Sequence, residues 1–127
     1  MKYSHYAEIT GTDFQIKSFL EQIGAPVDDI VDRVCARTMM APDPMLFDIC
    51  LRGSSADVQD MYKGFYGKDC DYIAFTSASR NTSYFSVAEV SRRVFAHEVT
   101  HIILNKMCPK LSIVCQEILA QAVESKI

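Results

Sequence analysis

Two histidines and a glutamate stand close together in the second half of the chain, within Phe-Ala-His-Glu-Val-Thr-His-Ile-Ile-Leu at residues 95–104. His97 and His101 are four residues apart, so on an α-helix their side chains point the same way, about 6 Å apart along the axis. That spacing allows two imidazole nitrogens to bind one zinc ion. Glu98 projects to an adjacent face, from which its carboxylate could act as a general base on a water at the metal. This H-E-x-x-H pattern predicts metal-assisted hydrolysis.

A helix must carry these side chains, and the surrounding residues favour a buried one. Ser86 and Glu89 form an S-x-x-E capping box ahead of the motif, and Pro109 ends the helix because the residue before a proline avoids the α conformation. Apolar residues cover most of the circumference, namely Val94, Phe95, Val99, Ile102, Ile103 and Leu104. Buried histidines and a glutamate need polar partners, which a metal ion with its water provides. The alternative is two core histidines satisfied by hydrogen bonds, with a solvent-exposed glutamate.

Two histidines leave a catalytic zinc site one protein ligand short. No histidine follows His101, so the third ligand must come from elsewhere, most simply from a carboxylate. Residues 112–125 predict a further helix, which a short loop returns against the metal helix. Its predicted apolar face consists of Val114, Ile118, Leu119, Ala122 and Val123. Glu117 lies one turn into this helix, on the same face as the small Ala120. Glu124 shares that face two turns further on, near the helix end, and is the second candidate.

The upstream residues alternate between helix and strand patterns. Helices are predicted over residues 13–23, 28–40 and 55–66, each followed by glycine or proline. Strands are predicted over residues 45–51, 71–76 and 82–86, the last two as a hairpin. Residues 1–12 form either a short strand or an ordered arm. The sequence therefore predicts an α+β fold, although the order of the strands in the sheet cannot be read from it.

Length and composition limit the class of protein. A chain of 127 residues predicts one domain, spanning residues 1–127. The net charge of −3 gives no indication of binding to nucleic acid or to an anionic membrane. The five cysteines are odd in number and form no C-x-x-C pair, so neither a disulfide framework nor a cysteine zinc site is expected. Without a secretory signal pattern or a long uncharged run, the chain is expected to be cytoplasmic, with reduced thiols.

The H-E-x-x-H motif and the helix after it together resemble the gluzincin zinc metallopeptidases. In that family a glutamate ligand follows on the next helix, and here residues 116–124 read Gln-Glu-Ile-Leu-Ala-Gln-Ala-Val-Glu. The similarity is closest to the compact, single-domain members called minimal gluzincins. It implies a zincin-like fold, in which a small mixed sheet places its edge strand beside the zinc helix. It also implies a zinc ion held by His97, His101 and Glu117. Glu98 would be the general base for peptide hydrolysis.

The chain departs from the family at several positions. Ile118 follows the expected glutamate ligand, where glycine is common, and Gln121 stands where thermolysin-like members have an acid. Val114 and Cys115 stand where an aromatic residue often precedes the ligand. Larger members also use a tyrosine or histidine from a C-terminal subdomain to stabilise the oxyanion. In this chain such a residue would have to come from the upstream half, where the sequence gives no basis for choosing among the tyrosines.

The strand directly before the zinc helix is expected to bind substrate. In zincins the corresponding strand pairs its backbone with an extended peptide, and here it contains Asn81, Thr82, Ser83, Tyr84 and Phe85. The alternative is an ordinary interior strand of the sheet.

The sequence therefore predicts a zinc peptidase acting on peptide or protein substrates. The main alternative is a catalytically silent zinc-binding module, with a regulatory or partner-binding role, on the same scaffold. A third reading is a metal-free helical protein with a chance motif.

Overall fold

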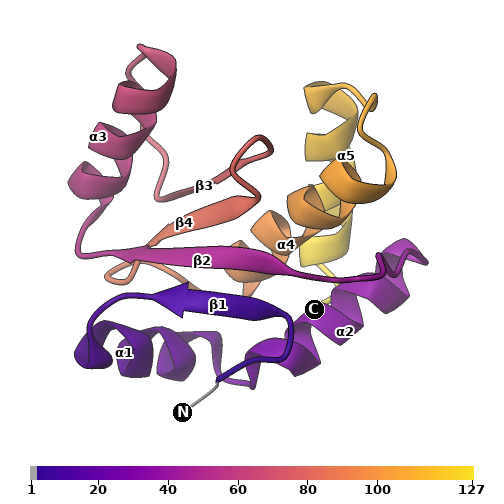
Figure 1. Ribbon diagram of the computed structural model, residues 1–127, viewed down its shortest axis with the longest axis horizontal. Coiled ribbons are helices and arrows are strands. Elements are labelled where there is room, and N and C mark those ends of the chain that lie inside the picture. The colour runs from indigo at the N-terminus through magenta and orange to yellow at the C-terminus, as the bar shows by residue number, and fades with distance from the viewer. Residues whose placement is uncertain (1–2) are drawn as a thin grey trace.

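A computed structural model describes residues 3–127, and within them four strands and five helices form an α+β fold (Figure 1). In chain order the elements are β1 (Ala7–Thr10), α1 (Asp13–Ile23), α2 (Val27–Thr38), β2 (Phe47–Arg52), α3 (Ser55–Tyr66), β3 (Ala74–Ser77), β4 (Thr82–Ser86), α4 (Arg92–Met107) and α5 (Ile113–Glu124). The predicted helices and strands are all present, and the strand of the N-terminal arm is β1. The predicted α+β class is confirmed.

The four strands form one mixed sheet in the order β1-β2-β4-β3. The pairs β1–β2 and β2–β4 are parallel, whereas β3 runs antiparallel to β4. Tyr84 of β4 lies opposite Cys50 of β2 on one side and opposite Phe75 of β3 on the other. The prediction that residues 81–86 form the edge beside the zinc helix is therefore wrong. The chain leaves β2 through α3, adds β3 at the outer edge and turns back, so the fully buried β4 fills the interior position.

The two faces of the sheet are covered by different helices. Phe85 of β4 contacts Phe19 of α1 and Phe95 of α4, with ring centroids 5.7 Å away in both cases. Its neighbour Tyr84 points to the opposite face, where its ring stacks on Phe75 at 4.6 Å and packs beneath α3. Successive strand residues alternate between the faces, so β4 contributes to both cores. The larger core fixes α4 against the sheet, and the smaller one fixes α3 (Figure 1).

Helix α4 begins later than the capping box predicted. The Ser86 hydroxyl does donate to the Glu89 carboxylate, but Ser86 is the last residue of β4. Its amide still donates to the backbone carbonyl of Ile73, directly before β3. The residues after it form a turn, and Ser91 caps the helix by accepting from the amide of Val94 at 3.2 Å. The helix ends directly before the residue that precedes Pro109, as predicted.

Helix α5 turns a different face inward from the one its apolar residues predicted. Its buried residues are Gln116, Ala120 and Val123, whereas Val114 is 70% exposed and Ile118 61% exposed. The rotation that brings residues 116 and 117 toward the histidines of α4 turns Val114 and Ile118 outward. The small Ala120 side chain, on the same side as Gln116, is completely buried.

Two further features bear on the predicted class. All five cysteines are free thiols. Across residues 3–127, no helix combines the length and the apolar character that crossing a membrane requires.

Candidate metal centre

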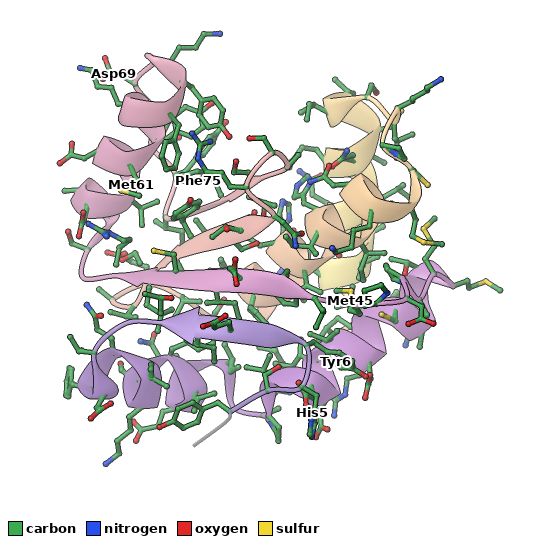
Figure 2. The ribbon with its side chains drawn as sticks, viewed as in Figure 1. His5, Tyr6, Met45, Met61, Asp69 and Phe75 are labelled. Carbon is green, nitrogen blue, oxygen red and sulfur yellow. The ribbon has the colours of Figure 1, made fainter. Side chains whose placement is uncertain are left out.

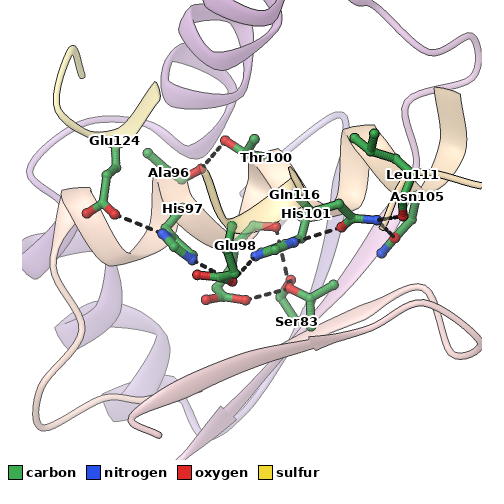
Figure 3. A network of polar contacts seen from close by, with 12 residues as sticks. Ser83, Ala96, His97, Glu98, Thr100, His101, Asn105, Leu111, Gln116 and Glu124 are labelled. Atoms are coloured by element: carbon green, nitrogen blue, oxygen red, sulfur yellow. Dashed lines mark hydrogen bonds and ion pairs between the residues drawn. The ribbon is translucent and has the colours of Figure 1, made fainter. Parts of the chain in front are cut away.

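Three side chains that could hold a metal ion meet between α4 and α5 (Figure 3). Glu117 Oε1 lies 3.2 Å from His97 Nε2 and 2.7 Å from His101 Nε2. One ligand atom from each residue falls within 4.8 Å of the others. The four-residue spacing on α4 places both rings over the same face, and α5 delivers the carboxylate from its second turn. The structure thus brings together the three residues predicted as ligands.

The other nitrogen of each ring is held by a hydrogen-bond acceptor. His97 Nδ1 lies 2.8 Å from Oε1 of Glu124. The other carboxylate oxygen of Glu124 accepts a hydrogen bond from Arg93 Nε at 2.8 Å. His101 Nδ1 lies 2.9 Å from Gln116 Oε1, and the Gln116 amide donates to Asn105 Oδ1 at 3.1 Å. Because these partners accept, each Nδ1 donates a proton to its partner, so each Nε2, once deprotonated, presents its lone pair on the side of Glu117 for a metal ion.

The donor set fits a divalent cation. A neutral imidazole has only one N–H, yet each of these rings faces acceptor oxygens at both nitrogens. The Nε2 contacts with Glu117 therefore require either extra protons or a metal ion between the three ligand atoms. Two imidazoles and one carboxylate are a set that zinc prefers at catalytic sites, where one position stays open.

The charges around the triad act on its pKa values in opposite directions. Burial alone would lower the pKa of His97, but the hydrogen bond that His97 donates to Glu124 and the charges of Glu98 and Glu117 outweigh it and raise that pKa. Burial would raise the pKa of Glu117, but the hydrogen bond to His101 and the nearby His97 outweigh it and lower that pKa. The site therefore favours a positive charge between the rings and the carboxylate.

Glu98 is buried beside the triad but is not one of its members. Its side chain is 7% exposed, and burial raises its pKa, although the nearby histidines and Thr76 act in the opposite direction. The Thr76 hydroxyl of β3 donates to Glu98 Oε1 at 2.8 Å, and Ser83 Oγ lies 2.8 Å from that hydroxyl (Figure 3). The alternative interpretation, two core histidines with a solvent-exposed glutamate, is therefore wrong about the exposure of Glu98. A buried carboxylate with raised pKa next to a metal-ligand cluster is suited to proton transfer.

The triad opens into a cleft of about 610 Å³. Its floor contains the triad, Glu98 and Thr76, while Ile113 of α5 borders it on one side. Three tyrosines contributed by α3 and by the segment before β3 line it as well, namely Tyr62, Tyr66 and Tyr72. A second cavity, of about 690 Å³, lies beside β1 at the other edge of the sheet and is not lined by the triad.

The residues predicted to bind substrate lie outside the cleft lining. Asn81 donates to the Leu46 carbonyl, and Tyr84 and Phe85 are buried in opposite cores. Only Ser83 reaches the site, through its contact with Thr76. Because β4 is paired on both sides, it has no free backbone groups for a peptide.

The residues that support the site could not all be identified from the sequence. Glu124 was the second candidate ligand, but its carboxylate contacts His97 Nδ1, on the far side of the ring from Glu117. Thr76 and Gln116 were not singled out. The sequence signal for Gln116 is its place beside Glu117, on the face of α5 that is turned toward α4. For Thr76 the signal is the alternation of strand residues, which puts its side chain on the other face of the sheet from Phe75.

Comparison of the chain with known protein families, with curated proteins and with solved structures finds no match. Its function must therefore be inferred from the site itself.

Proposed function

We propose that this protein is a zinc-dependent peptidase of minimal gluzincin type. The observation that carries the proposal is the position of Glu98, a buried carboxylate beside the metal-ligand cluster that is held by Thr76 and not by the triad. A site that only bound zinc would have no use for a buried base, which costs free energy to desolvate. The open cleft above the triad supports the same conclusion, because a catalytic site must admit a substrate.

The proposed reaction divides the chemistry between the metal and the chain. His97, His101 and Glu117 would hold zinc, which when bound supplies a Lewis acid that polarises water and a peptide carbonyl. Glu98 takes a proton from the attacking water and later delivers a proton to the leaving amine. Its raised pKa makes the carboxylate a stronger base for the first of these two transfers. The Thr76 hydroxyl keeps the carboxylate directed at the cleft.

Strand β3 is the proposed edge for substrate binding, in place of β4. Within residues 3–127 it pairs only with β4, and its residues Ala74, Phe75 and Thr76 line the cleft. An extended peptide that adds to this edge would run beside α4, with its carbonyls close to the triad. An antiparallel edge strand next to the histidine helix also supports the zincin-like assignment that the H-E-x-x-H motif implies.

Hydrolysis under control of a chelator tests the proposal. Zinc-loaded wild-type protein should cleave members of a broad peptide library or an unfolded protein, and a zinc chelator should abolish cleavage. Glu98→Gln keeps the shape of the side chain but cannot accept the proton. This variant should bind one zinc ion per chain and lose hydrolysis by about a hundredfold or more. A zinc-loaded wild-type protein that cleaves nothing would instead support a catalytically silent zinc-binding module.

A further inference from the structure

Aromatic side chains form one side of the metal cleft. Tyr62 of α3 packs against Tyr66 at 4.7 Å and against Tyr72, which precedes β3, at 5.3 Å between ring centroids. All three line the cleft, yet Tyr66 is 42% exposed and Tyr72 is 46% exposed. We call these three residues the tyrosine wall. Aromatic rings that are open to solvent inside a cleft offer a large apolar contact surface to whatever enters it.

The tyrosine wall is fixed by the smaller core beneath α3. Tyr62 meets Phe75 edge to face at 5.3 Å, and Phe75 in turn stacks on Tyr84 at 4.6 Å with an angle of 17° between the rings. Figure 2 shows Phe75 on the side of the sheet that α3 covers. Because these contacts exist before any substrate arrives, little ordering is required on binding, and more of the contact energy appears as affinity.

The wall stands close to the reacting groups. Burial raises the pKa of the Tyr72 hydroxyl, and the charge of Glu117 is among the nearby groups that add to this effect. Tyr72 also borders a third cavity, which is smaller than the other two and is lined by His97 and Glu124. A side chain resting on the wall would therefore belong to a residue next to the bond at the metal.

The other side of the cleft carries one exposed apolar side chain among polar ones, and the charged residues of the cleft are acidic. Ile113 at the start of α5 lines the cleft and is 70% exposed. Figure 1 shows α3 and α5 on opposite sides of the β3–β4 hairpin. The cleft lining contains the carboxylates of Glu98 and Glu117, and the part of it that the structure describes includes no lysine or arginine.

We propose that the cleft selects peptides with an aromatic or large aliphatic side chain beside the scissile bond, held between the tyrosine wall and Ile113. This specificity rests on the proposed peptidase function. Such a side chain would leave water for a preformed apolar slot, whereas a small one would leave the rings exposed. An acidic side chain would meet the site carboxylates, and with the metal engaged by the substrate carbonyl or the hydroxamate the described lining has no lysine or arginine to pair with it.

Three peptide hydroxamates that differ in one side chain test the specificity without requiring turnover. The hydroxamate group binds the metal in each, and the side chain is benzyl, methyl or carboxymethyl. Calorimetric titration of zinc-loaded protein should show the benzyl compound binding at least about tenfold more tightly than the methyl compound. The carboxymethyl compound should bind more weakly than either. Tyr66→Ala combined with Tyr72→Ala should remove the preference.

Control variants separate the wall from general effects on the fold. Tyr3→Ala removes an equally exposed tyrosine, 41% exposed, that lines the other cavity, and it should keep the full preference. Tyr66→Phe and Tyr72→Phe retain the rings and should also keep it. Ile113→Asp, at a site exposed enough to tolerate the change, should weaken benzyl binding about tenfold and leave zinc affinity unchanged.

The outcomes distinguish this inference from the function on which it rests. Equal binding of the benzyl and methyl compounds, or a preference that survives loss of both exposed tyrosines, overturns the specificity even if peptides are cleaved. Selective benzyl binding without any peptide cleavage supports the specificity of the slot and overturns the peptidase. If no hydroxamate binds the zinc-loaded protein, both proposals are wrong.

Discussion

Thr76 joins the edge strand to Glu98 on the metal helix, with its hydroxyl 2.8 Å from Oε1 of the glutamate and 3.4 Å from the Glu98 backbone carbonyl. Since the hydroxyl donates its proton to the carboxylate, the contact of 2.8 Å with Ser83 Oγ must be donated by the serine. The three residues thus form a line from the interior strand β4, through the edge strand β3, to the base on α4. The strand proposed to hold the substrate also holds the group proposed to activate the water.

Replacing Thr76 tests whether this line matters for turnover. Thr76→Val keeps the shape of the side chain but removes the donor, and we expect kcat to fall by about tenfold or more while zinc affinity stays unchanged. Thr76→Ser retains the hydroxyl and should restore most of the activity. The measurements are steady-state hydrolysis and a zinc titration of each variant. Equal activity of the valine and serine variants would show that Glu98 needs no support from β3.

The two glutamates of α5 should differ in their effect on zinc affinity. Glu117→Gln replaces the carboxylate that faces both Nε2 atoms, so it should lose most of the affinity. Glu124→Gln removes the charge of the acceptor at His97 Nδ1 and of the partner of Arg93 but no ligand atom, and we expect a loss of about tenfold. Competition with a chromophoric chelator measures both variants against the wild type. The reverse ranking would identify Glu124 as the ligand and Glu117 as the support.

Local patterns were sufficient to predict most elements, because they depend on neighbours in the sequence. Helix α1 is an example, since Thr12 caps it through a capping box with Gln15 and Gly24 ends it in a left-handed conformation. The pairing of the candidate ligands His97 and His101 follows from helical spacing alone, and the approach of Glu117 follows from the short return of α5 against α4. These features can be predicted without knowing the order of the strands in the sheet.

The strand order could not be predicted, because it depends on contacts between distant residues. Residues 82–86 are apolar or small on both faces, which fits an interior strand, but their position beside the zinc helix favoured the edge. The same limit applies to α5, where packing of Gln116 against His101 decided which face is buried. The support that Thr76 gives to Glu98 depends on β3 lying next to α4, a contact that strand alternation alone does not predict.

The orientation of α5 predicts opposite results for two substitutions on that helix. Ile118 is 61% exposed, so Ile118→Lys should change the free energy of unfolding by about 0.5 kcal/mol or less. Ala120 is completely buried, and Ala120→Leu should cost about 1–3 kcal/mol through overpacking. It should also weaken zinc binding, because it pushes Glu117 away from the histidines. Urea denaturation of both variants checks the ranking, and a larger cost for Ile118→Lys would contradict the orientation.

Removal of the metal should make the stability of the protein depend on pH in a defined direction. In the metal-free protein the pKa of His97 is raised from its ordinary 6.5, so its stabilising charge is fully present below 6.5 and is lost as the pH rises through the raised value. The raised pKa of Glu98 changes the free energy of unfolding in the same direction, because stability is lost as the pH rises above the ordinary pKa of 4.5. The lowered pKa of Glu117 acts only at acidic pH, where stability is lost below 4.5 as that carboxylate is protonated.

Metal-free protein should therefore be more stable at a pH of about 5.5 than at about 8.5, as measured by urea denaturation in a chelator. Zinc-loaded protein should show no such loss at the higher pH, because the metal takes the place of the proton between the rings and Glu117 and binds better when the imidazoles are neutral. Glu124→Gln serves as the control. It removes the hydrogen-bonded charge that does most to raise the pKa of His97, so the metal-free variant should lose less stability between the two pH values. Stability of the metal-free wild type that rises over this range would mean that these carboxylates do not hold His97 in its charged form.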